Sequence, residues 1–132
     1  MVRGGRSVFP GVVFVFQVMI RKAFKLFVDP SAHAEYERRH SPIWTELEQV
    51  LLDHGVRSYS IFLDAERSEL FAYAEIESEE RWEAIARTEV CQRWWAHMRD
   101  LMSTESDHRP KSQPLREVFH IESRETSQCI PS

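Results

Sequence analysis

The sequence predicts an α+β fold whose elements follow one another in the order β-α-β-β-α-β. Four short runs have the alternating apolar residues and β-formers of half-buried strands, at residues 20–28, 56–63, 70–76 and 115–121. The segments between the first two runs and between the last two have apolar residues at helical spacing, preceded by residues that cap helices. This order is the split βαβ pattern of ferredoxin-like folds, with one antiparallel sheet and helices on one face.

The first strand is followed by two predicted helices that meet at a corner. Residues 20–28 form the strand, with most of its apolar residues on one face. An Asp-Pro pair at 29–30 supplies an N-cap and a proline for the first turn, so a helix is predicted from there to about His40. A Ser-Pro pair at 41–42 repeats this combination and predicts a second helix at once. Gly55 ends that helix, because glycine suits the left-handed position after a helix.

The remaining elements are a hairpin, two further helices and a final strand. Residues 56–63 and 70–76 are predicted to pair as antiparallel strands around a polar turn. In the first of these strands, the expected faces are Tyr59, Ile61 and Leu63 on one side and Val56, Ser58, Ser60 and Phe62 on the other. Ser78 and Thr88 are the predicted N-caps of two helices, and residues 115–121 complete the sheet.

A four-stranded sheet with helices on one side leaves its second face open to water. In a small chain that face is often covered by a second sheet or shaped into a binding site. We therefore expect either a homodimer or a ligand cleft.

The composition suits one domain and excludes several classes of protein. The 132 residues suffice for a single core. With a formal net charge of -4, the chain is not expected to bind nucleic acid or to be held at a membrane by a basic patch. Its two cysteines form no paired-cysteine motif, so neither a disulfide framework nor a zinc site is predicted, and a reducing, cytoplasmic location is favoured.

Residues 1–18 and 123–132 are predicted to lie outside the domain, which spans residues 19–122. The N-terminal stretch joins basic residues to an apolar run, as secretory signals do. However, a Pro-Gly pair interrupts this run, which has no small-residue cleavage site and is too short to cross a bilayer. We favour an upstream extension, from a start codon assigned too early, over a true secretory signal, because Met19 directly precedes the first strand. The polar C-terminal tail is predicted to be disordered.

Tyr36 and His40 lie four residues apart at the end of the first predicted helix, so their side chains share one helix face. The helix dipole favours the imidazolium at that end and is expected to raise the pKa of His40. A histidine that titrates near neutral pH can give or take a proton in catalysis. The alternative is a corner residue whose ring nitrogen bonds a free helix carbonyl, and the motif does not separate the two.

Three further aromatic residues are candidate ligand contacts. Tyr59 is in the middle of a strand, where its hydroxyl can bond either a ligand or a core group. Trp94 and Trp95 are adjacent on a helix and point about 100° apart, so one is expected in the core while the other lines a pocket. Indole rings stack well on sugar C–H faces, but such a pair can equally cover the sheet or a subunit interface.

Other chemistries find no support in the sequence. The six histidines have no zinc-binding spacing, and the four glycines form no phosphate-binding loop. Cys91 falls in an apolar helical stripe rather than in the electropositive setting of a nucleophile. The carboxylates of residues 75–80 are interpreted as a solvated helix start rather than a glycosidase pair. We therefore expect no metal and no cofactor, which leaves proton transfer by side chains.

Several motifs resemble those of the L-rhamnose mutarotase family. They are MIRKAF, YERRHSPIWTELE, LFAYAEIESEERW, VCQRWW and EVFHI, and they extend from Met19 to about Ile121. Family members typically have Asn where this chain has Ser41, and both residues cap helices well. The resemblance implies a dimeric α+β barrel, in which the ferredoxin-like sheets of two protomers pack together.

The resemblance also implies a substrate and a site. The substrate would be L-rhamnose, whose α and β pyranose forms are interconverted in L-rhamnose metabolism. His40 would be the proton donor, and the substrate contacts would be Tyr36, Tyr59, Trp94 and Trp95.

Two other interpretations of the same residues stay open, because one fold hosts several functions. In the first, the barrel is a small-ligand or haem-binding module, and His40 is an axial ligand or a pocket residue. In the second, the corner and the tryptophan pair serve only to form the dimer.

Overall fold

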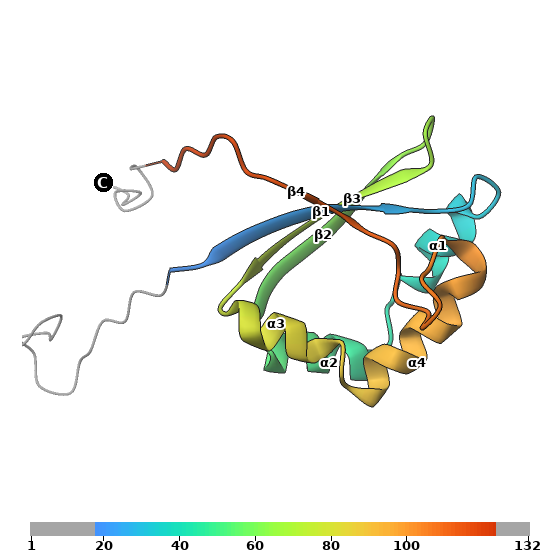
Figure 1. Ribbon diagram of the computed structural model, residues 1–132, viewed down its shortest axis with the longest axis horizontal. Coiled ribbons are helices and arrows are strands. Elements are labelled where there is room, and N and C mark those ends of the chain that lie inside the picture. Colours follow the sequence, from blue (N-terminus) through green and yellow to red (C-terminus); the bar gives the residue numbers. More distant parts are fainter. Residues whose placement is uncertain (1–17, 124–132) are drawn as a thin grey trace, which may run out of the picture.

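The computed structural model describes residues 18–123, which form one antiparallel sheet with helices on one of its faces (Figure 1). The elements are β1 (Ile20–Phe27), α1 (His33–Arg39), α2 (Thr45–Asp53), β2 (Val56–Asp64), β3 (Glu69–Ile76), α3 (Glu79–Ile85), α4 (Glu89–Met98), the 3-10 turn η1 (Arg99–Leu101) and β4 (Gln113–Leu115). The strand order across the sheet is β2-β3-β1-β4. The predicted β-α-β-β-α-β pattern is thus confirmed, with two consecutive helices in each α position. All but one residue each of the predicted extension and tail lie outside the described residues.

The register of the sheet decides which side chains face the helices. Leu26 of β1 lies opposite Leu70 of β3, and both are buried. Tyr59 of β2 pairs with a fully buried alanine of β3, and Ile61 and Leu63 follow on the same face. The predicted hairpin and the face that carries Tyr59 are therefore confirmed.

The prediction that Val56 shares the outer face with Ser58 is wrong. A bulge at Arg57 shifts the register, so that Val56 lies opposite Ile76. Val56 is thereby turned towards the helices, where it is buried in the core. Strict alternation assigns faces correctly only while no extra residue enters the strand.

The predicted helix caps around α3 and α4 are confirmed. The hydroxyl of Ser78 accepts a hydrogen bond from the backbone N–H of Arg81 at 3.1 Å, and that of Thr88 accepts one from Cys91 at 3.2 Å. Gly55, which follows α2, has a φ of 88°, a left-handed conformation that glycine adopts without strain.

The predicted caps of α1 and α2 are not formed. The carboxylate of Asp29 accepts hydrogen bonds from the backbone N–H and the hydroxyl of Ser31 at 2.9 and 2.8 Å, which makes a local turn, and α1 begins only at His33. The Ser41–Pro42 peptide bond is cis, and α2 begins three residues after the proline, at Thr45. Each Pro therefore lies in a turn before its helix rather than in the first helical turn.

The predicted position of the last strand, residues 115–121, is wrong except at Leu115, because the strand is shorter and begins earlier. β4 covers only Gln113–Leu115, where Leu115 pairs with Ala23 of β1. Residues 116–123, the C-terminal arm, leave the sheet as an extended segment (Figure 1). Val118, Phe119 and Ile121 in this arm are 79%, 76% and 77% exposed. The alternating pattern of a half-buried strand is present here, but within the described chain no neighbouring strand covers it.

Two clusters of buried side chains fill the space between the sheet and the helices. The first surrounds Met98, which is 1% exposed, and joins α1, α2 and α4 to β1 and β3. The second surrounds the fully buried Ile76 and joins α3 and α4 to β2 and β3. Trp95 packs against both clusters, so the candidate residues lie where the clusters meet.

Candidate active site

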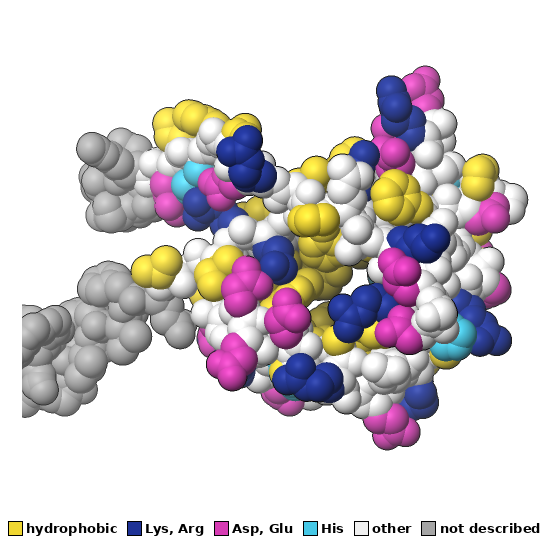
Figure 2. All heavy atoms as spheres, viewed as in Figure 1, with side chains coloured by type: hydrophobic (Ala, Val, Ile, Leu, Met, Phe, Trp, Pro, Cys, Tyr) yellow, Lys and Arg dark blue, Asp and Glu magenta, His cyan; other side chains and the backbone are white. Residues whose placement is uncertain are grey.

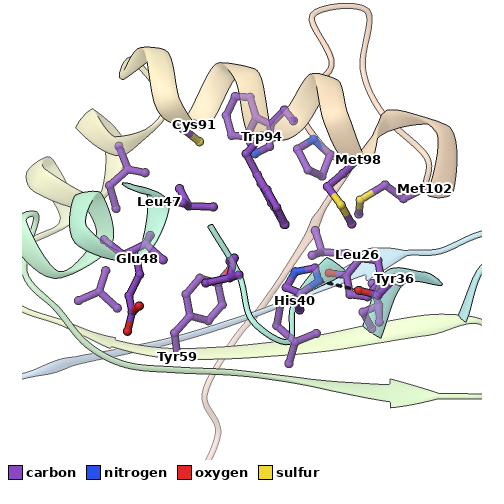
Figure 3. Close-up of a pocket in the computed structure, with 18 of the residues that line it drawn as sticks. Leu26, Tyr36, His40, Leu47, Glu48, Tyr59, Cys91, Trp94, Met98 and Met102 are labelled. Carbon is purple, nitrogen blue, oxygen red and sulfur yellow. Dashed lines mark hydrogen bonds between the residues drawn. The ribbon is translucent and has the colours of Figure 1, made fainter. Parts of the chain in front are cut away.

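A cavity of about 890 Å³ lies between the sheet and the helices (Figure 3). It is lined by all five residues selected from the sequence, namely Tyr36, His40, Tyr59, Trp94 and Trp95. They come from α1 and its C-terminal end, from β2 and from α4, so packing of distant segments brings them together. Ligand sites of small molecules usually measure about 300–1,000 Å³, and this cavity falls within that range.

His40 forms the C-terminal cap of α1, and its ring is held in one orientation. Its Nδ1 atom hydrogen-bonds the carbonyl oxygen of Tyr36 at 2.8 Å. The imidazole stacks on the Tyr36 ring with centroids 4.3 Å apart and meets the Trp94 ring edge-on at 5.2 Å. Because a carbonyl only accepts, Nδ1 carries a proton, and Nε2 has its lone pair free in the neutral ring.

The two roles considered for His40 are compatible. The helix carbonyl is indeed bonded by the ring, as the corner alternative requires. That bond uses only one ring nitrogen, and within residues 18–123 nothing bonds the other. His40 therefore lines the cavity with a nitrogen that is available to a ligand.

The expected rise in the pKa of His40 is wrong. Burial lowers the pKa of this imidazole below its ordinary value, because the cavity wall removes the charged form from water, and the hydrogen bond to Tyr36 only partly opposes this. The helix end was expected to dominate, but desolvation is the larger effect. His40 is consequently neutral at pH 7, with Nε2 as an acceptor, and its imidazolium is a stronger acid than that of a free histidine.

The two tyrosines present hydroxyls to the cavity. Burial raises the pKa of both Tyr36 and Tyr59, so the phenols stay protonated across the physiological range. Within the described chain, neither hydroxyl is hydrogen-bonded to another group. Tyr59 is held by aromatic contacts instead, at 6.5 Å from Phe24 and 5.7 Å from Trp82 between ring centroids. Both hydroxyls are thus oriented polar groups to which no other group of residues 18–123 is hydrogen-bonded.

Trp94 and Trp95 diverge, as their adjacent helical positions predict, yet both line the cavity. Trp94 is 8% exposed and packs in the core, edge-on to His40 and 5.0 Å from the Trp44 ring. Trp95 is only half-buried, and the guanidinium carbon of Arg109 lies 5.1 Å from its ring centroid. One indole therefore belongs to the inner wall and the other to a more open part of the cavity.

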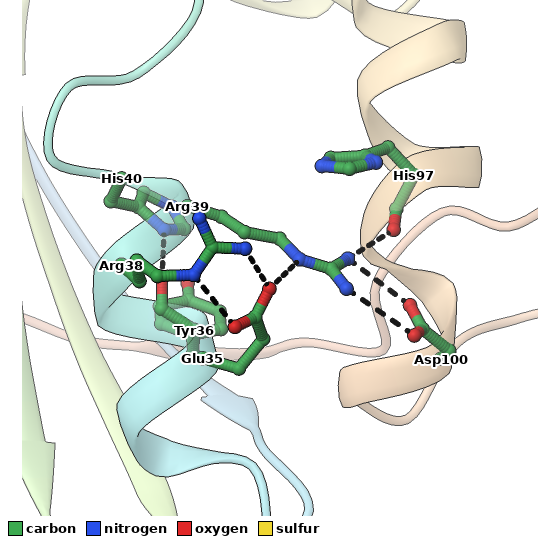
Figure 4. Close-up of polar contacts among 7 residues, drawn as sticks. All are labelled: Glu35, Tyr36, Arg38, Arg39, His40, His97 and Asp100. Atoms are coloured by element: carbon green, nitrogen blue, oxygen red, sulfur yellow. Dashed lines mark hydrogen bonds and ion pairs between the residues drawn. The ribbon is translucent and has the colours of Figure 1, made fainter.

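Arg39 fastens the end of α1 to α4 (Figure 4). Its Nε donates to Glu35 at 2.8 Å, while Nη1 donates to the backbone carbonyl of His97 at 2.6 Å and to Asp100 at 3.2 Å. The next residue along the chain is His40, so these bonds set the position of its ring relative to α4.

Glu48 and Arg109 are two of the five charged residues that line the cavity and were not selected from the sequence; the other three are Glu37, Arg57 and Glu83. Glu48 lies on α2 and Arg109 on the loop before β4, and both line the cavity. Glu48 follows the buried Leu47, which places it at the edge of the apolar helix face. No sequence pattern distinguishes either residue from an ordinary surface charge.

The described residues show no metal-binding arrangement and no membrane span. Among residues 18–123, no group of three or more His, Cys, Asp or Glu side chains could hold a metal ion. None of the helices in this range is both long and apolar enough to cross a bilayer.

The fold and the cavity define a ferredoxin-like domain with a cavity of small-ligand size, lined by one histidine, two tyrosines and two tryptophans among other residues. The family model described as L-rhamnose mutarotase matches residues 21–121. The L-rhamnose mutarotase of Yersinia pestis (strain Pestoides F) is 62% identical over 104 residues, which are 79% of this chain and 100% of that protein. That of Enterobacter sp. (strain 638) is 61% identical over the same length. The chain therefore belongs to the L-rhamnose mutarotase family, whose members are carbohydrate isomerases.

Solved structures agree with this assignment. The crystal structure of L-rhamnose mutarotase from Formosa agariphila has a TM-score of 0.72 and 39% identity, covering 78% of this chain and 99% of that chain. A conserved protein from Methanosarcina mazei Go1, with a TM-score of 0.54 and 16% identity, shares the fold alone. The predicted fold class, the ferredoxin-like sheet found in dimeric α+β barrels, is confirmed.

Proposed function

We propose that this chain interconverts the α and β pyranose forms of L-rhamnose by acid–base catalysis. The observation that carries the proposal is the Nε2 nitrogen of His40 in the wall of the cavity, which no group of the described chain bonds. The identity to L-rhamnose mutarotases along their whole length supports the choice of sugar and a role in L-rhamnose metabolism.

In the proposed mechanism, His40 exchanges one proton with the sugar. The imidazolium donates the Nε2 proton to the ring oxygen while the anomeric hydroxyl releases its proton to water. The bond between C1 and the ring oxygen breaks, which leaves an open-chain aldehyde and a neutral imidazole. Rotation about C1–C2 presents the other face of the carbonyl. Ring closure reverses both proton transfers and gives the other anomer.

The lowered pKa suits His40 to this exchange. The imidazolium of a buried ring is a stronger acid, which favours protonation of the weakly basic ring oxygen. The neutral form, which ring closure needs as a base, is the abundant form at pH 7. A placed acid or base is worth about 10²–10⁴-fold in rate, enough for a reaction that sugars also undergo unaided.

The other four residues are proposed to hold the substrate. The unbonded hydroxyls of Tyr36 and Tyr59 offer hydrogen bonds to sugar hydroxyls. The indoles of Trp94 and Trp95 offer flat apolar surfaces for sugar C–H groups and for the methyl group of a 6-deoxy sugar. No cofactor is needed for this chemistry.

We also propose that the chain functions as a homodimer through the outer face of the sheet. Phe62, Phe71 and Leu115 on this face are 64%, 37% and 39% exposed. The C-terminal arm continues from β4 and adds further exposed apolar side chains. A second sheet packed on this face would cover these groups, as the barrel of the family implies.

We place the functional domain at residues 19–122 and the protein in the cytoplasm. The whole length of the relatives is matched by 79% of this chain, which supports the domain limits. Cys91, a buried free thiol, fits a reducing compartment.

Saturation-transfer NMR tests the activity directly. When the anomeric proton of α-L-rhamnose is saturated, the saturation should be transferred to the β anomer faster in the presence of the purified protein. A panel of other aldoses measures the preference for rhamnose. Rhamnose exchange at the buffer rate would contradict the proposal, and a Soret absorption band in the purified protein would favour the haem-binding alternative.

Sedimentation velocity tests the dimer. Phe71→Asp on the outer face and Phe119→Asp on the arm should each shift the protein from dimer to monomer, because a carboxylate is costly to bury. Ser106→Asp adds the same charge to an exposed loop and should leave the dimer intact. Identical sedimentation of all three variants and the original chain would refute an interface at this face.

A further inference from the structure

Arg109 occupies a defined position beside the candidate site. It lies on the loop between η1 and β4, which is closed by a bridge between Thr104 and Pro110. Its backbone N–H donates to the Asp107 carboxylate at 3.1 Å, and its carbonyl accepts from the N–H of Glu105 at 2.7 Å. The loop therefore holds the backbone of Arg109, although the residue itself is exposed.

The side chain of Arg109 is directed at the cavity rather than at a carboxylate. Its guanidinium carbon lies 5.1 Å from the centroid of the Trp95 ring, and both residues line the cavity. The positive charge also reaches the inner wall, where it partly offsets the burial that raises the pKa of the Cys91 thiol. Figure 2 shows a hollow between the sheet and the helices, with apolar surface inside it and basic side chains beside its rim.

Most arginines of residues 18–123 are paired with a carboxylate. Those in ion pairs are Arg21, Arg38, Arg39, Arg57, Arg67, Arg81 and Arg93. The guanidinium of Arg109 forms no hydrogen bond or ion pair within the described chain. Its five N–H donors are thus unused within residues 18–123, and the guanidinium lies over the Trp95 ring at cation–π distance.

We propose that Arg109 is a substrate-binding residue, which donates hydrogen bonds to hydroxyl oxygens of the bound sugar and holds the sugar against Trp95. The inference rests on the proposed mutarotase function and adds a specificity-determining group to it. A planar guanidinium can donate two parallel hydrogen bonds, which matches two neighbouring hydroxyls of a pyranose. The same group repels cationic ligands and so selects neutral or anionic ones.

Loss of Arg109 should weaken binding more than turnover. The contacts are made to hydroxyls that do not react, so they are present in the ground state and in the transition state alike. Removing such uniform binding raises KM and leaves kcat nearly unchanged. For lost hydrogen bonds to a charged donor, the rise in KM should be about ten- to a hundredfold.

The experiment measures NMR anomer exchange against L-rhamnose concentration for Arg109→Met, Arg109→Lys and the matched control Arg87→Met. Arg87 is likewise exposed and without a carboxylate partner in the described chain, but it does not line the cavity. We expect a raised KM for Arg109→Met, partial recovery in Arg109→Lys and unchanged kinetics for Arg87→Met. Thermal unfolding of each variant verifies that the fold is retained.

Monodeoxy analogues of L-rhamnose separate direct contact from support of the Trp95 ring. An analogue that lacks a hydroxyl bound by Arg109 should bind the original protein more weakly than L-rhamnose does. The same analogue and L-rhamnose should bind Arg109→Met equally well. The inference is overturned if KM is unchanged in Arg109→Met, or if every analogue weakens binding to the original protein and to Arg109→Met by the same factor. Either result can be obtained while the original chain still catalyses anomer exchange. If the original chain shows no exchange, the proposed function fails. Arg109 can then still be tested through the affinity for L-rhamnose, measured by tryptophan fluorescence on the same variants.

Discussion

His40 and His54 make the same contact at the ends of two helices, which allows catalysis and capping to be separated. The Nδ1 atom of His40 bonds the carbonyl of Tyr36, and that of His54 bonds the carbonyl of Val50, both at 2.8 Å and both four residues back. Only His40 lines the cavity. His40→Ala and His54→Ala therefore remove matched hydrogen bonds, and we predict that only His40→Ala abolishes anomer exchange.

The expected magnitudes follow from these contacts. Each substitution removes one side-chain hydrogen bond to the backbone, worth about 0.5–1.5 kcal/mol of folding stability. His40→Ala also removes the ring contacts with Tyr36 and Trp94, each worth about 0.5–1.5 kcal/mol. Both variants should unfold at lower temperature, His40→Ala more so. The exchange rate should fall about 10²–10⁴-fold for His40→Ala alone, the usual contribution of a placed acid or base.

The assay combines saturation-transfer NMR with thermal unfolding, at a temperature where both variants are folded. An exchange rate for His40→Ala within a factor of two of that for His54→Ala would refute the catalytic role and leave His40 as a cap. If both variants lose exchange activity equally, the loss would be due to reduced stability of the folded protein rather than to the removal of a catalytic group.

Three other properties follow from the same structure. Because burial lowers the pKa of His40, the folded state binds fewer protons than the unfolded state just below pH ~6.5. The free energy of unfolding should therefore decrease as the pH falls from ~6.5 to the lowered pKa of the folded state. Urea titrations should show a smaller decrease for His40→Ala. Met98→Ala should cost about 2–5 kcal/mol in the same titrations, because Met98 is 1% exposed and its removal leaves a cavity, whereas Met98→Leu should cost less than about 1.5 kcal/mol. Burial raises the pKa of the Cys91 thiol to about 12, so little reactive thiolate is present at pH 8. In a Cys129→Ser background, iodoacetamide at pH 8 should therefore label the chain only after unfolding, as measured by mass spectrometry. Rapid labelling of the folded protein would contradict this burial.

The differences between prediction and structure each have a physical cause. The Asp-Pro and Ser-Pro pairs indicated that helices were near, but their caps were misplaced because residues 29–32 and 41–44 form turns first. The bulge at Arg57 reversed the face of Val56, since alternation has no means of registering an extra residue. The exposed C-terminal arm has the pattern of a strand whose partner is not among the described residues.

The sequence alone determined the order of the elements, the caps of α3 and α4, the left-handed Gly55 and the helix face shared by Tyr36 and His40. These properties depend on residues within about one or two turns of each other, where capping and periodicity act. Only the tertiary structure decided that these residues meet Tyr59 and the tryptophan pair around one cavity, and that the pKa of His40 falls rather than rises. It also placed Arg109 over Trp95. Burial and contacts between distant segments arise from packing of the whole chain, and that packing sets the charge state and the neighbours of each group.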